Sequence, residues 1–309
     1  MSNVKSRTEA ELARIAGLAP GRVGVFALHV ESGHTLALNA DEFFPMASTV
    51  KVPIAMAVLA RVDKGELKLS DMVEVDPLEM NPSGPLGEEF LQPGVALSVI
   101  NLMEPMITRS DNTATDVLLR LVNGPAGVQR YLTELRVEGI RPSRTIRDLL
   151  GVLYGIAVPA QGSMRDAIRA LSPADHAAAK AKAQAPNPEY FDDERDQATP
   201  AGMVELLRRL WQRDGVSPRA HDMLVGIMGR TSTGVRRIAG RLPPGVKTAD
   251  KTGSASGTTN DCGFIFLPGG AGTVALCVYV KACPLPAEER EVVIADLART
   301  VYAHFIMTA

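Results

Sequence analysis

The spacing of apolar residues along the chain predicts which segments are helices and which are strands. Apolar side chains recur every second residue in a half-buried strand and every three to four residues in an amphipathic helix. The helical spacing predicts helices over residues 8–16, 49–63, 98–108, 112–122, 125–136, 144–150, 164–171, 173–185, 200–213, 217–228 and 286–307. The strand pattern predicts strands over residues 24–30, 35–38, 246–252, 260–267 and 273–281. The closing helix is expected to bury one face that carries Val292, Leu297, Val301 and Phe305.

Two strands, a long run of helices, three strands and a last helix form the element order of an α+β protein. We expect residues 1–45 and 200–309 to share one five-stranded antiparallel sheet, flanked by the N- and C-terminal helices. Residues 46–199 would form an inserted all-helical domain, in which residues 71–95 hold several prolines and glycines and are expected to be irregular. A cleft between the two parts is the expected ligand site, because ligands favour domain interfaces.

Composition and charge are those of an ordinary globular protein and exclude several classes of partner. The 309 residues are 46% hydrophobic and 22% charged, with a formal net charge of −2, so neither nucleic acid nor an anionic membrane is an expected partner. No stretch approaches the roughly 18 apolar residues of a membrane span. The charged first eleven residues are not a signal peptide. We expect a monomer that stays in the cytoplasm as the chain stands, or is periplasmic or secreted if a leader has been removed.

Cysteine and histidine usage gives no sign of a disulfide framework or a metal site. The three cysteines are an odd and sparse set, although one bridge between Cys262 and Cys277 on neighbouring strands stays open. The five histidines form no His-x-x-x-His pattern, and there is no Cys-x-x-Cys. We therefore expect neither a metal nor another cofactor.

Candidate chemistry begins with Ser48 and Lys51, at the start of the helix predicted over residues 49–63. Side chains three residues apart on a helix share one face, with Cβ atoms about 5–6 Å apart. A serine hydroxyl needs a base to take its proton, and a lysine can serve if burial or a neighbouring cation lowers its pKa toward roughly 7 or 8. The same spacing at Ser2 and Lys5 is accidental, so the motif needs companions.

Two later motifs complete a set. Ser110-Asp111-Asn112 lies between two predicted helices, and Lys251-Thr252-Gly253-Ser254 precedes a predicted strand. Ser-x-x-Lys, Ser-Asp-Asn and Lys-Thr-Gly in this order are typical of class A β-lactamases and penicillin-binding proteins. The chain resembles class A β-lactamases over roughly residues 8–307, and further matching segments are Phe44-Pro45-Met46, Asp111–Asp116, Gly124–Val128, Thr199–Met203 and Gly257–Asp261.

The resemblance implies a β-lactamase/transpeptidase-like fold and a serine hydrolase that forms an acyl-enzyme. The catalytic residues that it implies are Ser48, Lys51, Ser110 and Lys251. The substrate-binding residues that it implies are Asn112, Thr252, Gly253 and Ser254.

Each of these residues has an expected role. Ser48 would be the nucleophile and Lys51 its base, and Ser110 would pass a proton to the leaving nitrogen. The backbone N–H groups of Ser48 and Ser254 would form the oxyanion hole. Gly253 would let the substrate approach the strand edge closely.

The substrate's polar groups have expected partners too. The Asn112 amide would meet an acylamide carbonyl, and Lys251 with Thr252 would meet a carboxylate. Arg236, Arg237 or Arg241 could add a cation, although the protein surface is the expected place for each.

One loop departs from the family pattern. Class A enzymes carry Arg-x-Glu-x-x-Leu-Asn, whose glutamate activates the deacylating water. The matching segment here is Arg144–Leu150, with Ile146 at the glutamate position and Leu150 at the asparagine position, inside an extended loop at about 143–198. Isoleucine cannot accept a proton, and losing a general base costs about 10²–10⁴-fold in rate. Carboxylates that could replace the glutamate are Asp148, Glu189, Asp192, Asp193 and Glu194.

Three functions remain open for a chain with these motifs, each with a small-molecule substrate. The first is a β-lactamase whose deacylation is slow. The second is an esterase, amidase or peptidase on the same scaffold. The third is a penicillin-binding or sensor module that is acylated and goes no further. The acidic residues 192–196 are expected to cap a helix and form salt bridges in each case.

Overall fold

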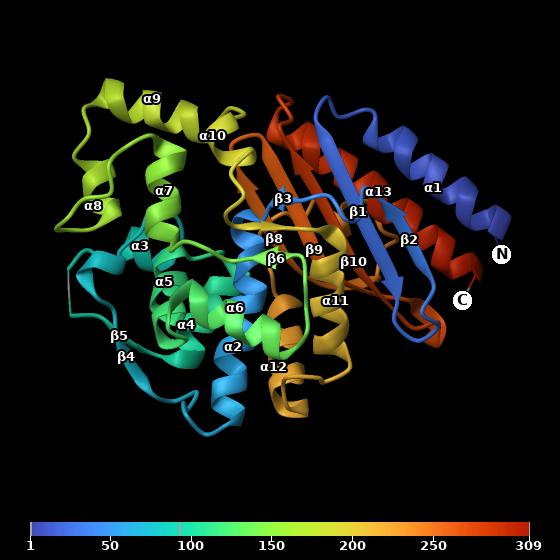
Figure 1. Cartoon of the computed structure of the whole chain (residues 1–309), viewed down its shortest axis with the longest axis horizontal. Coiled ribbons are helices and arrows are strands. Elements are labelled where there is room, and N and C mark those ends of the chain that lie inside the picture. The colour runs from blue at the N-terminus through green and yellow to red at the C-terminus, as the bar shows by residue number, and fades with distance from the viewer. Residues whose placement is uncertain (1, 93, 309) are drawn as a thin grey trace.

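A five-stranded antiparallel sheet brings together strands from both ends of the chain (Figure 1). The structure is a computed structural model that describes residues 2–92 and 94–308. The strand order is β2-β1-β10-β9-β8. The strands are β1 (Arg22–His29), β2 (Thr35–Leu38), β8 (Lys247–Ala255), β9 (Thr258–Phe266) and β10 (Thr273–Lys281). The fold class predicted from the element order is therefore confirmed.

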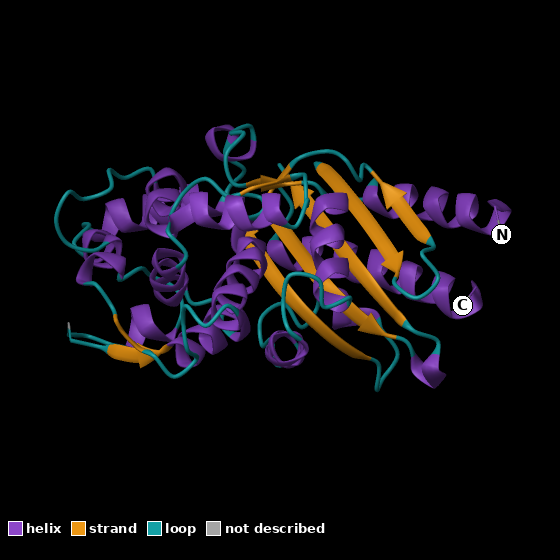
Figure 2. Cartoon of the chain, turned by 60° about the horizontal axis from the view of Figure 1, so that its bottom comes forward, coloured by secondary structure: helices purple, strands orange, loops and turns teal. Residues whose placement is uncertain are grey.

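Helices cover both faces of this sheet (Figure 2). Helices α1 (Ser2–Ala16) and α13 (Ala287–Thr308) pack on one face, and α11 (Pro200–Trp211) packs on the other. Alternate residues of β10 accordingly enter two different cores: Val278 packs with α13, whereas its neighbour Tyr279 packs on the α11 side. Burial on both faces explains why β10 is apolar along almost its whole length.

The closing helix follows its predicted bounds but not its whole predicted face. Leu297, Val301 and Phe305 are buried as expected, whereas Val292 is 40% exposed. Val293 takes the place predicted for Val292 and is only 4% exposed. The prediction for Val292 is wrong because Val292 lies five positions before Leu297 and so points to a different face of the helix. Val293 lies four positions before Leu297 and shares its buried face.

The helices between the two halves of the sheet form a second part, built around the buried helix α2 (Lys51–Asp63). Around it lie α4 (Val99–Thr108), α5 (Asn112–Leu121), α6 (Gly124–Glu134) and α12 (Pro218–Met228), all close to their predicted bounds. Helix α12 contacts α2, α4 and also strand β8. The exact division of the chain into 1–45 with 200–309 and 46–199 stays a prediction.

The segment expected to be irregular contains short regular elements. They are β4 (Met72–Glu74), the 3₁₀ turn η2 (Pro77–Glu79), α3 (Pro85–Glu89) and β5 (Ala96–Ser98). Pro77 and Pro85 occupy the first positions of helical turns, where proline is tolerated because its missing N–H would have no partner. These prolines begin structure here instead of breaking it.

The extended loop at 143–198 is folded. It contains α7 (Ile146–Tyr154), α8 (Met164–Arg169), α9 (Pro173–Gln184) and α10 (Pro188–Phe191), and the first three confirm the helices predicted there. Each helix begins after a Ser, Thr or Asn whose side chain accepts a hydrogen bond from the first turn. The segment has its own small core, made by Ile146, Leu149, Leu150, Leu153, Met164, Ile168 and Tyr190.

Short strands tie the end of this segment to the start of the catalytic region. Strand β7 (Gln197–Ala198) pairs with β3 (Phe44–Pro45) on one side and with β6 (Ile140–Arg141) on the other. None of the helices within 2–92 and 94–308 is both long and apolar enough to cross a membrane. The compartment in which the chain works stays a prediction.

The possible disulfide does not form. Cys262 and Cys277 lie directly opposite each other on β9 and β10, as neighbouring strands require, but both thiols are free. Both side chains are fully buried, and burial raises the pKa of each thiol well above its usual value. They behave as small apolar core residues.

Candidate active site

Ser48 lies in a tight 3₁₀ turn, η1 (Ala47–Val50), which leads into α2. The residue before it, Ala47, has φ of +47°, a strained value for a residue with a side chain. Hydrogen bonds hold Met46, the residue before Ala47, in place. Met46 N–H donates to the Asp196 carbonyl at 2.9 Å, and the Met46 carbonyl accepts from Thr49 N–H at 3.1 Å, Thr49 Oγ1 at 2.8 Å and Asn260 Nδ2 at 3.1 Å. The surrounding structure thus imposes the conformation that presents Ser48.

Gly253 fits this turn for a reason that the sequence did not reveal. A Cβ atom on Gly253 would lie 2.8 Å from the Met46 carbonyl oxygen and 3.0 Å from Ser48 N. Strand β8 therefore needs glycine here so that the nucleophile turn can pack against it. The sequence interpretation named only the approach of a substrate.

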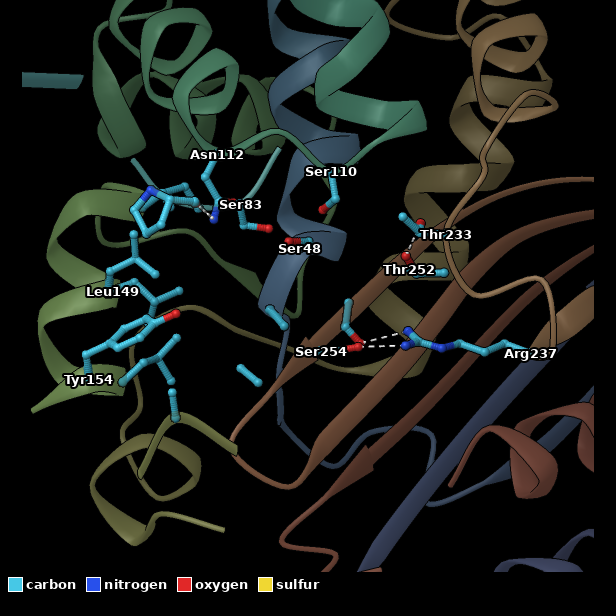
Figure 3. Close-up of a pocket in the computed structure, with 18 residues that line it drawn as sticks. Ser48, Ser83, Ser110, Asn112, Leu149, Tyr154, Thr233, Arg237, Thr252 and Ser254 are labelled. Atoms are coloured by element: carbon cyan, nitrogen blue, oxygen red, sulfur yellow. Dashed lines mark hydrogen bonds between the residues drawn. The ribbon is translucent and has the colours of Figure 1, made fainter. Parts of the chain in front are cut away.

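Ser110 Oγ lies between two buried lysines. Lys51 Nζ donates to Ser110 Oγ at 3.1 Å, to the Ser110 carbonyl at 2.7 Å and to Asn112 Oδ1 at 2.9 Å. Lys251 Nζ donates to Ser110 Oγ at 3.1 Å as well. Since the Ser110 oxygen accepts from both lysines, its own hydrogen is free to point elsewhere. Figure 3 shows Ser110 directed toward Ser48 across the cavity.

Burial changes the acidity of both lysines. Burial lowers the pKa of Lys51 well below its usual value, and the neighbouring charge of Lys251 lowers it further. Burial also lowers the pKa of Lys251, to about 8. These are the two causes, burial and a nearby cation, that the sequence interpretation required of a lysine acting as a base.

The other side of the cavity offers hydroxyls and a guanidinium. Thr252 Oγ1 lies 2.6 Å from Thr233 Oγ1, and Arg237 Nη2 donates to Ser254 Oγ at 2.6 Å (Figure 3). Arg237 also donates to the carbonyls of Gly253 at 3.0 Å and Asn260 at 2.8 Å. These bonds fix the guanidinium along strand β8 beside the cavity.

Of the three arginines considered from sequence, one belongs to this site. Arg237 is only 6% exposed, so its expected place at the surface is wrong. Arg241 instead pairs with Asp296 at the surface, and Arg236 is exposed. Thr233 was missed altogether, because nothing in the sequence pairs it with Thr252.

Both polar atoms of the Asn112 side chain make hydrogen bonds. Its Oδ1 accepts from Lys51, and its Nδ2 donates to the Pro82 carbonyl at 2.9 Å. The Asn112 amide carries two N–H hydrogens, so one remains for a substrate carbonyl while the other binds the Pro82 carbonyl.

These groups surround a cavity of about 410 Å³, a typical size for a small-molecule site. Five of its lining residues come from α7 and are mostly apolar: Ile146, Leu149, Leu150, Leu153 and Tyr154. The cavity lining identified among the described residues contains no aspartate or glutamate. All five carboxylates considered as replacements lie outside that lining: Asp148, Glu189, Asp192, Asp193 and Glu194.

The acidic residues near 192–196 form ion pairs, as expected. Arg144 Nη1 binds Asp193 at 3.0 Å and Arg144 Nε binds Asp196 at 2.5 Å, while Asp193 also binds Arg195 at 2.7 Å. The Asp196 carbonyl accepts from Met46, so this cluster also supports the nucleophile turn. The sequence gave no sign of that second role.

Asp116 is a further residue that sequence reasoning missed. Its carboxylate accepts from the N–H groups of Ile146 at 2.7 Å and Arg147 at 2.9 Å, and from Asn81 Nδ2 at 2.8 Å. Burial raises the pKa of Asp116 to about 6. Asp116 thereby fixes the first turn of α7, the helix that supplies the apolar wall.

The fold and the motifs define this protein as a serine hydrolase of the class A β-lactamase type. The chain belongs to the β-lactamase enzyme family, whose sequence pattern matches residues 7–305. It is 28% identical over 295 residues to β-lactamase VEB-1 of Pseudomonas aeruginosa, across 92% of this chain and 86% of that protein. The sequence predictions of family, fold and enzyme class are confirmed, and the comparisons do not favour the esterase or sensor alternatives.

Comparison with solved structures supports the same family. An ancestral (GNCA) class A β-lactamase matches with a TM-score of 0.78 and 31% identity, covering 96% of this chain and 99% of that one. A β-lactamase from Xanthomonas campestris matches with a TM-score of 0.78 and 30% identity, covering 97% and 98% of the two chains.

Proposed function

We propose that this enzyme opens β-lactams by forming an acyl-enzyme on Ser48, and that this acyl-enzyme is hydrolysed slowly. The observation that carries the proposal is an asymmetry in the cavity. Ser110 shares the cavity lining with Ser48 and is bonded to two buried lysines, on the side where proton transfer during acylation is needed. The facing wall from α7 has Ile146 where a water-activating carboxylate is expected.

Acylation needs a base, an acid and an oxyanion site. Lys51 takes the proton from Ser48 as its oxygen attacks the lactam carbonyl. Ser110 passes its own proton to the leaving nitrogen as the C–N bond breaks, and Lys51 returns the Ser48 proton to Ser110 Oγ. The N–H groups of Ser48 and Ser254 stabilise the oxyanion, which is worth about 3–4 kcal/mol in such sites. The contacts of Ser110 Oγ with the Nζ atoms of Lys51 and Lys251 support its role as the proton carrier.

Substrate binding uses the opposite polar groups. A carboxylate on the substrate binds beside Lys251, Thr252 and Thr233, in the positive field of Arg237. Because Gly253 has no side chain, the substrate can lie close to the backbone of strand β8. The acylamide carbonyl binds the Asn112 amide.

Deacylation lacks a comparable base. Water attacking the ester must lose a proton on the side of α7, and the residue there is Ile146. The buried carboxylate of Asp116 is already bonded to two N–H groups of α7 and to Asn81. These hydrogen bonds hold α7 in place, and they leave the Asp116 carboxylate poorly placed to accept a proton from water.

Replacing Lys251 by alanine is expected to slow acylation at least tenfold without unfolding the protein. The substitution removes the charge that faces the substrate carboxylate and Ser110, but a fully buried ammonium is costly to the folded state. The melting temperature should therefore stay the same or rise. The test compares the acylation rate constant with the melting temperature. Unchanged acylation with a large fall in melting temperature would make Lys251 a structural residue.

The acylation rate constant is expected to fall as pH rises through about 8. Lys251, whose pKa burial lowers to about 8, is charged below that pH and neutral above it, so carboxylate binding weakens in alkaline solution. Lys51 must be neutral to accept a proton, so acylation also falls in acid, below the lowered pKa of Lys51. Stopped-flow measurements between pH 5 and about 10 give the profile. An alkaline fall that persists unchanged in Lys251→Ala would contradict the assignment.

A further inference from the structure

Tyr190 is a buried tyrosine of the extended segment, and its hydroxyl has no hydrogen-bond partner. It lies in α10, the short helix that leads into β7 (Figure 1), and its side chain is only 1% exposed. The ring belongs to the small core of the segment, but Oη makes no hydrogen bond of ordinary distance and angle. A buried hydroxyl without a partner destabilises the folded state, and phenylalanine at this position would avoid that cost.

The Tyr190 hydroxyl lies beside the nucleophile turn. Helix α10 contacts β3, which ends at Pro45, two residues before Ala47. Burial and the charge of Asp196 raise the pKa of the hydroxyl, and the backbone N–H of Ala47 is near enough to lower it in part. This N–H has no backbone acceptor within residues 2–92 and 94–308. A donor and an acceptor thus lie close together, and neither has another partner there.

The Ala47 N–H is the less firmly held side of a peptide group that sets the nucleophile turn. The carbonyl side, from Met46, accepts hydrogen bonds from Thr49 and Asn260. Ala47 has the strained φ of +47°, and its conformation sets the direction of the next N–H, that of Ser48. An oxyanion donor must be fixed before the charge develops. A group that holds the Ala47 N–H therefore acts on the oxyanion hole through the backbone.

We propose that Tyr190 is a positioning residue for the nucleophile, and that its hydroxyl accepts a hydrogen bond from the Ala47 N–H as the acyl-enzyme forms. The inference rests on the proposed function. Tyr190 is not part of the cavity lining, so it acts on the reaction only through the turn. Catalytic hydrogen bonds are often long without substrate and shorten during the reaction, which accounts for the unpaired hydroxyl. Such a bond speeds the reaction step and does not strengthen substrate binding.

Tyr190→Phe tests the proposal because it keeps the ring and removes only the hydroxyl. Intact mass spectrometry at several concentrations of a penicillin gives the limiting rate constant of adduct formation and the half-saturating concentration. The limiting rate constant should fall about three- to tenfold, as expected for the loss of one hydrogen bond between neutral groups. The half-saturating concentration should change by less than about twofold. The melting temperature should stay the same or rise, because an unpaired buried hydroxyl is removed.

Tyr131→Phe is the matched control. Tyr131 is also buried, at 8% exposed, and its hydroxyl donates to the Gly215 carbonyl at 3.3 Å, outside the cavity lining. Its loss should leave the limiting rate constant unchanged. A second readout is pH: since the raised pKa keeps the Tyr190 hydroxyl protonated between pH 5 and about 9, Tyr190→Phe should reduce the rate constant by the same factor throughout that range.

The outcomes separate this proposal from the one on which it rests. An unchanged limiting rate constant in Tyr190→Phe would overturn the role of Tyr190 while leaving acylation of Ser48 intact. A lower melting temperature with a higher half-saturating concentration would make the hydroxyl structural, and a reduction that varies with pH would make it a proton-transfer group; either result would overturn the proposal. No adduct with the unchanged protein would overturn the Ser48 acyl-enzyme itself, and the positioning role with it.

Discussion

Mixed with a chromogenic cephalosporin, the protein is expected to release a burst of product about equal to its own concentration and then to continue slowly. Acylation can use Lys51 and Ser110, but water attacking the ester finds Ile146 in place of a base. A missing general base costs about 10²–10⁴-fold, so the slow phase should lag acylation by a comparable factor. Stopped-flow absorbance resolves the two phases. Fast turnover from the first seconds, with no burst, would contradict slow deacylation.

Two sets of variants identify the cause of the slow phase. Ile146→Glu places a carboxylate at the start of α7, where the helix dipole favours it, and should speed the slow phase at least tenfold. Ile146→Gln is the matched control, since it is polar but cannot accept the proton as a carboxylate does. Alanine at each of the five carboxylates outside the cavity lining should leave the slow phase unchanged: Asp148, Glu189, Asp192, Asp193 and Glu194.

Asp116 is a buried carboxylate close to α7, and its substitution tests whether it can act as the deacylation base. It is buried at the first turn of α7, and Asp116→Asn would remove its charge. We expect Asp116→Asn to change the stability of α7. Deacylation should stay as slow as in the unchanged protein. If turnover proved fast and Asp116→Asn restored a burst, Asp116 would be the missing base.

Ser48→Ala is expected to abolish covalent labelling by penicillin. Removing the nucleophile of a serine hydrolase lowers turnover on the order of 10⁶-fold, because no other group forms the covalent intermediate. In the unchanged protein, peptide mapping should find the label between Phe44 and Lys51. Ser83→Ala is the control: Ser83 lines the same cavity, and its hydroxyl has no proposed part in the reaction. Equal labelling of Ser48→Ala would contradict the assignment.

The sequence predicted the elements whose patterns are local. Helix α5 follows from its apolar spacing, and the three catalytic motifs follow from the order in which they occur. Strand β10 follows from its continuous run of β-branched and apolar residues. Each of these signals lies within one short stretch, so one sequence suffices to read it.

Features that depend on contacts between distant segments could not be predicted. Arg237 resembled its neighbours Arg236 and Arg241 in sequence, and only its bonds to Gly253 and Asn260 distinguish it. The support that Asp116 gives to α7 likewise joins residues thirty positions apart.

The extended segment illustrates the same limit. Its helices could be predicted from their apolar spacing and composition, but its position over the cavity could not. That position depends on the bonds from the β8–β9 turn to Ala183 and Gln184, which no local pattern encodes. The apolar wall that α7 gives the cavity is therefore a property of the fold, although every residue in it is visible in the sequence.

The intact mass of the protein after mixing with a penicillin, followed over hours, tests the central claim most directly. The account predicts that the mass rises by that of one penicillin, that the adduct maps to Ser48, and that it persists after the free penicillin is removed. Rapid consumption of penicillin with no adduct at any time would contradict the claim that acylation outruns deacylation.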